Sequence, residues 1–185
     1  MTYLYYPGCS LKGTGKAYEE SVRAVFDALG VPLKELDDWN CCGATAYMAI
    51  DELKAFTLAV RNLVLAERQS GQPQGSAVDL VVPCNACYLV LTKAHRYMNE
   101  YAEIGRKIEG VLDAAGLHYE GRVNVRHPLD VLVNDIGLEK ISAKVSRALS
   151  GLHVACYYGC QMVRPYATFD NQRNPTKMDE LMEAL

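Results

Sequence analysis

The hydrophobic positions of this sequence alternate between short continuous runs and runs with helical spacing. Four short runs rich in β-branched and aromatic residues predict strands, at residues 2–6, 31–36, 78–82 and 122–126. Apolar residues three and four apart predict helices over 18–29 and 51–69, and a further helix ends near residue 98. The continuous apolar run at 78–82 is typical of a strand buried on both faces of a parallel sheet. The pattern predicts an α/β fold with an open, mostly parallel sheet flanked by helices.

Composition and charge exclude several classes of protein. The chain has 185 residues, half of them hydrophobic, and its net charge of -3 is not the basic surplus of a nucleic-acid-binding protein. Its most apolar stretch, 80–91, is interrupted by Pro83 and polar residues and is too short to span a bilayer. The first eight residues lack the charged and apolar segments of a signal peptide. We therefore expect a soluble, cytoplasmic protein.

Cysteines carry the strongest chemical signal in the sequence. The seven are Cys9, Cys41, Cys42, Cys84, Cys87, Cys156 and Cys160. Their number is odd and the expected compartment is reducing, which argues against a disulfide scaffold. Buried apolar thiols would account for Cys156, but not for an adjacent pair together with a C-x-x-C pair. Cys9 and the C-x-x-C pair each follow a predicted strand, and such loops converge at one edge of an open α/β sheet. A metal or cluster site at that edge is the better interpretation.

The number of thiols distinguishes between the metal sites that these cysteines can form. A zinc site takes four ligands, usually from two C-x-x-C-like pairs. Cys84 and Cys87 form one such pair, whereas the adjacent Cys41 and Cys42 diverge and suit two atoms of a larger cluster. Cys9 makes five thiolates, and two unit charges roughly 4 Å apart repel by about 4 kcal/mol at an effective dielectric constant of 20. Several iron ions would remove that cost, so the spacing favours a polynuclear iron–sulfur cluster with an unusual fifth ligand.

A short pattern occurs twice in the chain. The residues Tyr-Tyr-Pro-Gly-Cys at 5–9 are matched about 150 residues later by Tyr-Tyr-Gly-Cys at 157–160. By analogy with the first copy, residues 152–158 are predicted to form the buried opening strand of a second repeat. The predicted domains are residues 1–150, a cysteine-rich α/β domain, and residues 151–185, the start of a second, incomplete repeat.

The cysteine spacing and four short segments resemble a known family. Thirty-one residues separate Cys9 from Cys41, and forty separate Gly43 from Cys84. With the segments YYPGCS, NCCG, VVPCNACY and HVACYYGCQMVRP, this spacing resembles the CCG motif of the heterodisulfide reductase B subunit and its relatives. The resemblance covers nearly the whole chain, although the gap before the C-x-x-C pair is somewhat longer than usual.

This resemblance implies a cofactor, a reaction and partners. The implied cofactor is a noncubane 4Fe–4S cluster, with the ligands Cys9, Cys41, Cys42, Cys84 and Cys87. Cys160 would be the first ligand of a second cluster that this chain does not complete. The implied reaction is the reduction, or in reverse the formation, of a disulfide of a small-molecule thiol substrate. The implied partners are an iron–sulfur C subunit and a flavin-containing A subunit.

Other polar residues carry weaker signals. His127 is a candidate catalytic residue, because imidazole titrates near neutral pH and can protonate a departing thiolate. The alternative is a helix-start residue before Pro128. His153 is interpreted as a buried histidine next to the predicted second-repeat strand. Lys12 and Lys16 either attract an anionic substrate or are ordinary surface lysines.

Three functions remain open on the sequence alone. The first is a disulfide-reducing enzyme subunit, and the second is an electron-transfer iron–sulfur module with no open coordination site. The third is a zinc-stabilised interaction domain, which would bind one metal ion and no sulfide. A chain without its cofactor and with oxidised cysteines is a further state to consider. An unpaired strand edge in the second repeat would also favour a homodimer.

Overall fold

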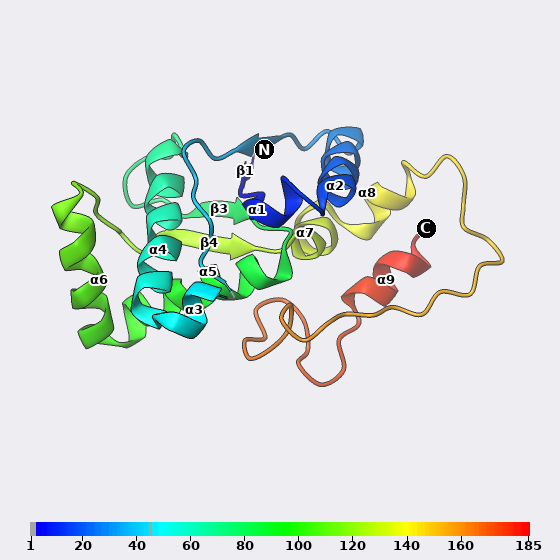
Figure 1. The fold of residues 1–185 in the computed structure, drawn as a ribbon. Helices are drawn as coiled ribbons and strands as arrows, with labels where there is room; N and C mark the ends of the chain where they lie inside the picture. The colour runs from blue at the N-terminus through cyan, green and yellow to red at the C-terminus, as the bar shows by residue number, and fades with distance from the viewer. Residues whose placement is uncertain (1–2, 45) are drawn as a thin grey trace.

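The computed structural model has one fully parallel sheet, which confirms the expected α/β fold (Figure 1). It describes residues 3–44 and 46–185. Four short strands lie in the order β2-β1-β3-β4, and every neighbouring pair is parallel. They are β1 (Tyr3–Tyr5), β2 (Leu33–Glu35), β3 (Val78–Val81) and β4 (Val123–Arg126). Each strand lies within a segment whose apolar run predicts it.

Helices connect the strands and cover both faces of the sheet (Figure 1). They are α1 (Gly8–Leu11), α2 (Lys16–Ala28), α3 (Ala46–Ile50), α4 (Glu52–Gln69), α5 (Asn85–Glu100), α6 (Ala102–Ala114), α7 (Pro128–Asp130), the π-helical η1 (Val131–Ile136), α8 (Leu138–Ser142) and α9 (Lys177–Glu183). The start of α4 is fixed by Asp51, whose carboxylate accepts the backbone N–H of Lys54 at 3.1 Å. No helix in the described ranges is long and apolar enough to cross a membrane.

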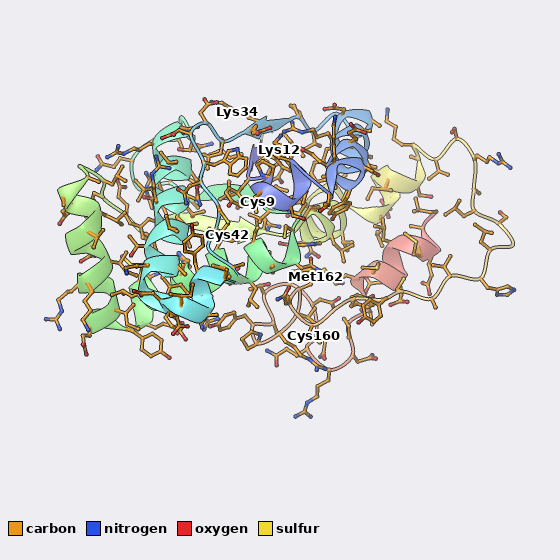
Figure 2. All side chains as sticks on the ribbon, viewed as in Figure 1. Cys9, Lys12, Lys34, Cys42, Cys160 and Met162 are labelled. Atoms are coloured by element: carbon orange, nitrogen blue, oxygen red, sulfur yellow. The ribbon has the colours of Figure 1, made fainter. Side chains whose placement is uncertain are left out.

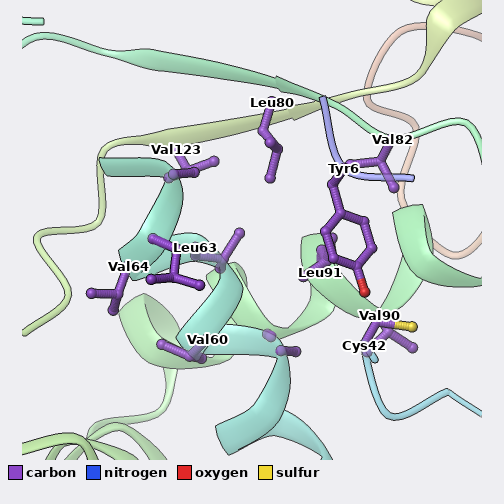
Figure 3. Packing of buried hydrophobic residues seen from close by; sticks show 14 of the residues in the cluster. Tyr6, Cys42, Val60, Leu63, Val64, Leu80, Val82, Val90, Leu91 and Val123 are labelled. Carbon is purple, nitrogen blue, oxygen red and sulfur yellow. The ribbon is translucent and has the colours of Figure 1, made fainter. Parts of the chain in front are cut away.

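Alternate residues of the first strand belong to two different hydrophobic cores. Leu4 and Tyr6 point into the larger core, which α4, α5 and α6 complete (Figure 3). Tyr3 and Tyr5 point to the opposite face, where they pack with Phe26 of α2. This two-residue period is the one expected of a strand covered on both sides. The strand therefore sits at the centre of the molecule, and whatever follows it is held in a fixed place.

The segment after α8 departs from the prediction. Residues 152–158 form no strand, so the predicted opening strand of a second repeat is wrong. A strand needs a neighbour for its backbone N–H and C=O groups, and this segment runs apart from the sheet (Figure 1). Tyr157 is 91% exposed. His153 is exposed as well, which corrects the expectation of a buried histidine, because no core forms around it.

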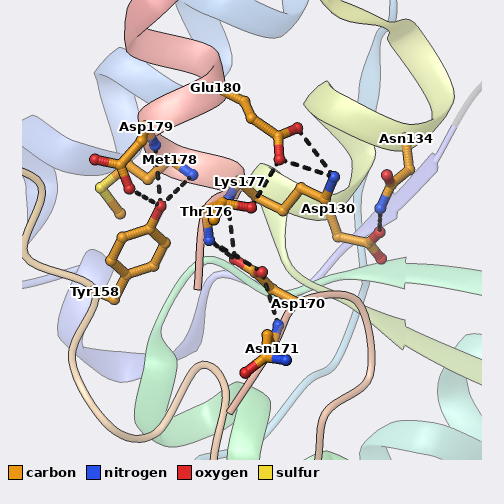
Figure 4. Close-up of polar contacts among 10 residues, drawn as sticks. All are labelled: Asp130, Asn134, Tyr158, Asp170, Asn171, Thr176, Lys177, Met178, Asp179 and Glu180. Carbon is orange, nitrogen blue, oxygen red and sulfur yellow. Dashed lines mark hydrogen bonds and ion pairs between the residues drawn. The ribbon is translucent and has the colours of Figure 1, made fainter. Parts of the chain in front are cut away.

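Polar contacts hold the C-terminal region in place (Figure 4). The hydroxyl of Tyr158 donates to the Asp179 carboxylate at 2.5 Å and accepts backbone N–H groups at the start of α9. The Asp170 carboxylate accepts another backbone N–H there at 3.0 Å. Met162 and Leu129 form part of a small, separate core. Side-chain to backbone bonds, rather than strand pairing, order this region.

Candidate metal centre

The candidate metal centre lies at the carboxyl ends of the two central strands. β1 leads through Pro7 and Gly8 to Cys9 in α1. β3 leads through Pro83 to Cys84, the N-cap residue of α5. β1 lies between β2 and β3, so the strand order changes direction beside it. In open α/β sheets such a point opens a crevice in which ligands bind.

Four of the thiols form two close pairs, and Figure 2 labels one cysteine of each pair, Cys9 and Cys42. The Sγ atoms of Cys42 and Cys87 lie 3.2 Å apart, and both residues are buried. The Sγ atoms of Cys9 and Cys41 lie 3.8 Å apart, where Cys9 is exposed and Cys41 is half-buried. Cys84 adjoins the buried pair through a hydrogen bond with Cys87. The fold brings all five of these cysteines into one neighbourhood.

The glycine at position 8 leaves room for the sulfur of Cys87, one member of the buried pair. Gly8 has a φ of +71°, in the left-handed region that glycine adopts without steric cost. A Cβ atom at this position would lie 2.9 Å from Cys87 Sγ and 3.3 Å from the Tyr6 ring. Any other residue at position 8 would therefore push against the sulfur. The turn between β1 and α1 is shaped around the thiols.

An asparagine and a tyrosine hold the segment that carries the adjacent cysteines Cys41 and Cys42. Asn62 is fully buried in α4, where its side chain accepts the Asn40 backbone N–H at 2.9 Å and donates to the Asn40 carbonyl at 3.0 Å. The Tyr6 hydroxyl donates to the same carbonyl at 2.8 Å. Neither Asn62 nor Tyr6 is among the site residues predicted from the sequence. Asn62 could have been found from the sequence as a polar amide among apolar residues on the buried face of an amphipathic helix.

Hydrogen bonds among the thiols separate their acidities. Bonding with Cys87, helped by backbone N–H groups at the start of α5, lowers the pKa of Cys84 to about 6. Bonding with Cys87 also lowers the pKa of Cys42. The pKa of Cys87 is raised by its bonds to Cys42 and Cys84 and then by burial. Burial is the main cause that raises the pKa of Cys41. Cys42 and Cys84 therefore tend to be thiolates, while Cys87 between them keeps its proton. Binding of a metal cation would displace that proton.

The donor set fits a cluster of several metal atoms better than a single ion. Within residues 3–44 and 46–185, no three His, Cys, Asp or Glu side chains are arranged as ligands of one metal ion. The sulfur atoms instead form one buried pair, one solvent-facing pair and the neighbouring Cys84. Cysteine thiolates are the usual ligands of iron–sulfur clusters. Five such donors, four of them in two pairs and the fifth at Cys84, fit a polynuclear cluster.

His127 lies beside the C-x-x-C turn. Its Nε2 is 3.0 Å from Oδ1 of Asn85, and its Nδ1 accepts the backbone N–H of Leu129 at 3.2 Å. The imidazole stacks on the Phe169 ring with the centroids 6.0 Å apart. Burial lowers the pKa of His127 to about 4, so the ring is neutral at pH 7. These contacts are those of the helix-start residue that the sequence offered as the alternative, and a catalytic role stays a prediction.

The last two cysteines lie outside the group of five. Cys160 is exposed (Figure 2) and Cys156 is half-buried. The backbone before Cys160 nevertheless approaches the centre, because a Cβ atom at Gly159 would lie 3.7 Å from the Asn85 side chain. The role of Cys160 as the first ligand of a second cluster stays a prediction.

A groove joins the two copies of the Tyr-Tyr/Gly-Cys pattern. It has a volume of about 450 Å³, and its lining includes Cys84 and Asn85 together with Tyr158 and Met162. Ser10, next to Cys9, also lines it. The second copy of the pattern thus borders the centre that the first copy helps to build.

Comparison with known proteins gives the family. Residues 3–92, which carry all five gathered cysteines, match the family model of the cysteine-rich CCG domain. Residues 3–92 therefore contain a cysteine-rich CCG domain. The match confirms the resemblance that the CCG spacing indicates, and it includes β1, β2 and β3 together with the start of α5.

Several proteins similar to this chain are named after subunits of reductases. It is 34% identical to a protein named as similar to the heterodisulfide reductase B subunit, from Archaeoglobus profundus, over all of this chain and 61% of the relative. It is 31% identical to an 8-methylmenaquinol:fumarate reductase membrane anchor subunit of Wolinella succinogenes, over 99% and 61%. It is 29% identical to the B subunit of a ferredoxin/F420H2-dependent CoB-CoM heterodisulfide reductase of Methanosarcina acetivorans, over 96% and 57%. The CCG chain thus spans about three fifths of the length of these relatives.

Proposed function

We propose that this chain is the iron–sulfur B subunit of a heterodisulfide reductase-like complex. Its cofactor is a noncubane 4Fe–4S cluster, and the ligands are Cys9, Cys41, Cys42, Cys84 and Cys87. At this cluster the disulfide of a small-molecule thiol substrate is reduced or, in reverse, formed. The protein acts in the cytoplasm with an iron–sulfur C subunit and a flavin-containing A subunit. Formation of a homodimer remains a separate prediction.

The gathering of five thiols in one neighbourhood, one of them packed against a glycine, carries this proposal. A Cβ atom at position 8 would lie 2.9 Å from Cys87 Sγ. Because Gly8 has no side chain, the backbone can pass close to this sulfur. The buried Asn62 holds the Asn40 backbone, so the fold itself places the segment that carries Cys41 and Cys42. Such preorganisation lowers the cost of bringing negative sulfur ligands together. The heterodisulfide reductase relatives support the same assignment.

The chain's own residues divide the work of binding and access. A bound cluster would supply single electrons and iron positions that accept the two sulfurs of a disulfide. The groove beside Cys84 and Asn85 offers a path by which a thiol substrate reaches the centre. Tyr6 keeps its proton, because burial and the neighbouring cysteines raise the pKa of its hydroxyl. It therefore orients the Asn40 carbonyl rather than supplying a proton.

A second candidate function is electron transfer without disulfide chemistry. The Wolinella succinogenes relative is named as a component of a reductase for 8-methylmenaquinol and fumarate, and neither compound is a disulfide. In that case the same cysteines would hold a cluster that passes electrons and does not respond to thiols. The two functions share the ligands and differ in whether substrate sulfur reaches the iron.

Metal analysis of chain produced and purified without oxygen tests both functions. About four iron and matching acid-labile sulfide per chain, with an EPR signal that appears on adding a thiol under oxidising conditions, would support disulfide chemistry. The same iron content without a response to thiols would support electron transfer. One zinc and no sulfide would contradict both. Cys42→Ser should lose iron, whereas Cys156→Ser, outside the group, should retain it.

A further inference from the structure

The two thiol pairs of the centre differ in their access to solvent. The outer pair, Cys9 and Cys41, has one exposed and one half-buried residue, with the Sγ atoms 3.8 Å apart. The inner pair, Cys42 and Cys87, has its Sγ atoms only 3.2 Å apart, but the residues are 2% and 3% exposed. Distance alone would favour a bond in the inner pair. Access favours the outer pair.

We propose that the outer pair of the cluster-free chain reacts with low-molecular-weight disulfides and closes to a Cys9–Cys41 disulfide, while the inner pair stays reduced. This goes beyond the proposed function, since it requires neither the cluster nor an electron-donating partner. It makes Cys9 a site of reversible thiol modification and Cys41 the residue that resolves it.

The exchange balances with the small disulfide as the oxidant. The thiolate of Cys9 attacks one sulfur of the disulfide RSSR, whose S–S bond breaks, and one RSH leaves with a proton. The thiolate of Cys41 then attacks Cys9 Sγ in the mixed disulfide, and the second RSH leaves. The two protein thiols lose two electrons and two protons, and the two RSH products carry them. The product is an intrachain disulfide between Cys9 and Cys41.

The geometry allows this closure with little movement. The outer sulfurs must approach by about 2 Å to reach the S–S bond length of about 2.05 Å. An exposed and a half-buried side chain can turn that far without displacing core residues. The inner pair has no such route, because an incoming disulfide needs a line of approach to one buried sulfur. Access therefore selects which bond forms first.

Closure of the outer pair would control loading of the centre. A Cys9–Cys41 disulfide removes two of the five thiols, so a chain in this state must be reduced before it can bind a complete cluster. The inner pair and Cys84 stay available throughout. In the cluster-free chain, the oxidation state of the outer pair thus follows the ratio of thiols to disulfides in the surrounding solution.

Disulfide mapping of the full cluster-free chain tests the proposal. The reduced chain is mixed with excess oxidised glutathione, sampled over time, alkylated and digested with trypsin. Cys9 lies on the fragment 1–12, Cys41 and Cys42 lie on 35–54, and Cys87 lies on 69–93. We expect the link between 1–12 and 35–54 to form first. Earlier formation of the link between 35–54 and 69–93 would overturn the proposal.

Three comparisons separate this from unselective oxidation. With Cys41→Ser, a glutathione adduct should persist on Cys9, whereas with Cys42→Ser the link from 1–12 to 35–54 should still form. Cys160 is also exposed but lies outside the thiol pairs, so its adduct should persist in the unmodified chain. An adduct on Cys9 that lasts as long as the one on Cys160 would contradict the assignment of Cys41. In concentrated urea the preference for the Cys9–Cys41 link should disappear. Because no step needs iron, the outcome of this test does not depend on the proposed function.

Discussion

Two stretches of this chain share a Tyr-Tyr pair followed by Gly-Cys, yet their surroundings are opposite. Tyr5 is completely buried, whereas the matching Tyr157 is 91% exposed. Cys9 faces another thiol at 3.8 Å, whereas Cys160 is exposed and outside the group of five. The first stretch continues a central strand with neighbours on both sides, and the second runs apart from the sheet. The same residues contribute to the candidate metal centre only where a sheet positions them.

The local turn is nevertheless the same in both stretches. Gly8 has a φ of +71° and Gly159 has a φ of +69°. A glycine before a cysteine thus adopts a left-handed turn in both surroundings, because this preference belongs to the residue itself. Burial and partners are properties of the whole fold. The short motif therefore encodes the turn, and the tertiary structure adds everything else.

The largest contrast should come from removing the matched tyrosine rings. Tyr5→Ala empties a filled core position and should lower the free energy of unfolding by about 3–5 kcal/mol. Tyr157→Ala removes an exposed ring and should change it by less than about 0.5 kcal/mol. Urea denaturation of the cluster-free chain measures both values. Equal losses would show that Tyr157 is buried in solution and that the contrast between the two stretches does not hold.

A buried and an exposed histidine, His127 and His153, should likewise differ in their effect on stability in acid. Burial lowers the pKa of His127 to about 4, below the value of about 6.5 in an unfolded chain, so the unfolded chain binds an extra proton between these values. Stability should be complete above about pH 6.5 and fall by about 3 kcal/mol as the pH drops to about 4. His127→Gln should flatten this pH dependence, measured by urea denaturation at each pH. His153→Gln, at an exposed position, is the control and should leave it unchanged.

Substitution of the matched glycines should separate backbone strain from crowding. Ala at either position costs about 1 kcal/mol for the left-handed backbone. Gly8→Ala also brings a Cβ to 2.9 Å from Cys87 Sγ, so its total loss should be about 2–3 kcal/mol, with lower iron content after anaerobic reconstitution. Gly159→Ala meets its nearest atom at 3.7 Å and should keep full iron content. Equal iron contents would refute the space-making role of Gly8.

The smallest expected effect distinguishes the ring of Tyr5 from its hydroxyl. The hydroxyl is buried without a hydrogen-bond partner among the described residues, while the Arg23 guanidinium lies 4.5 Å from the ring centroid. Tyr5→Phe should therefore be neutral or stabilising by up to about 0.5 kcal/mol. Tyr3→Phe is the matched control, because it loses a hydrogen bond of 2.6 Å to Asp135 and should cost about 1 kcal/mol. Thermal or urea unfolding distinguishes the two variants.

The sequence predicts the sheet well because its strands are short, apolar and bounded by turns. Residues 78–82 predict β3 almost to the residue, and the rule that loops converge at strand ends brings Cys9 and Cys84 together. Residues 152–158 have the same apolar character and form no strand. Periodicity reports which side chains can be buried, but pairing depends on whether another strand lies alongside.

The arrangement within the centre lies beyond what spacing can predict. The spacing identifies five thiols, but it does not divide them into a buried and a solvent-facing pair. That division depends on the segment from Asn40 to Gly43, which is placed by hydrogen bonds with Asn62 in another element. Asn62 lies twenty-two positions after Asn40 and belongs to no recognisable sequence motif. Long-range side-chain to backbone bonds of this kind leave no periodic trace in a sequence.

Pairing of Leu4 with Leu80 joins parts of the chain that are distant in sequence. Such pairing costs the conformational freedom of the intervening chain, and the packing of the sheet must offset this cost. Cys9 and Cys84 lie near each other because their two strands are paired. The complete set of five sulfurs comes into existence only with the finished sheet. Any loss of sheet pairing should therefore also disperse the candidate metal ligands.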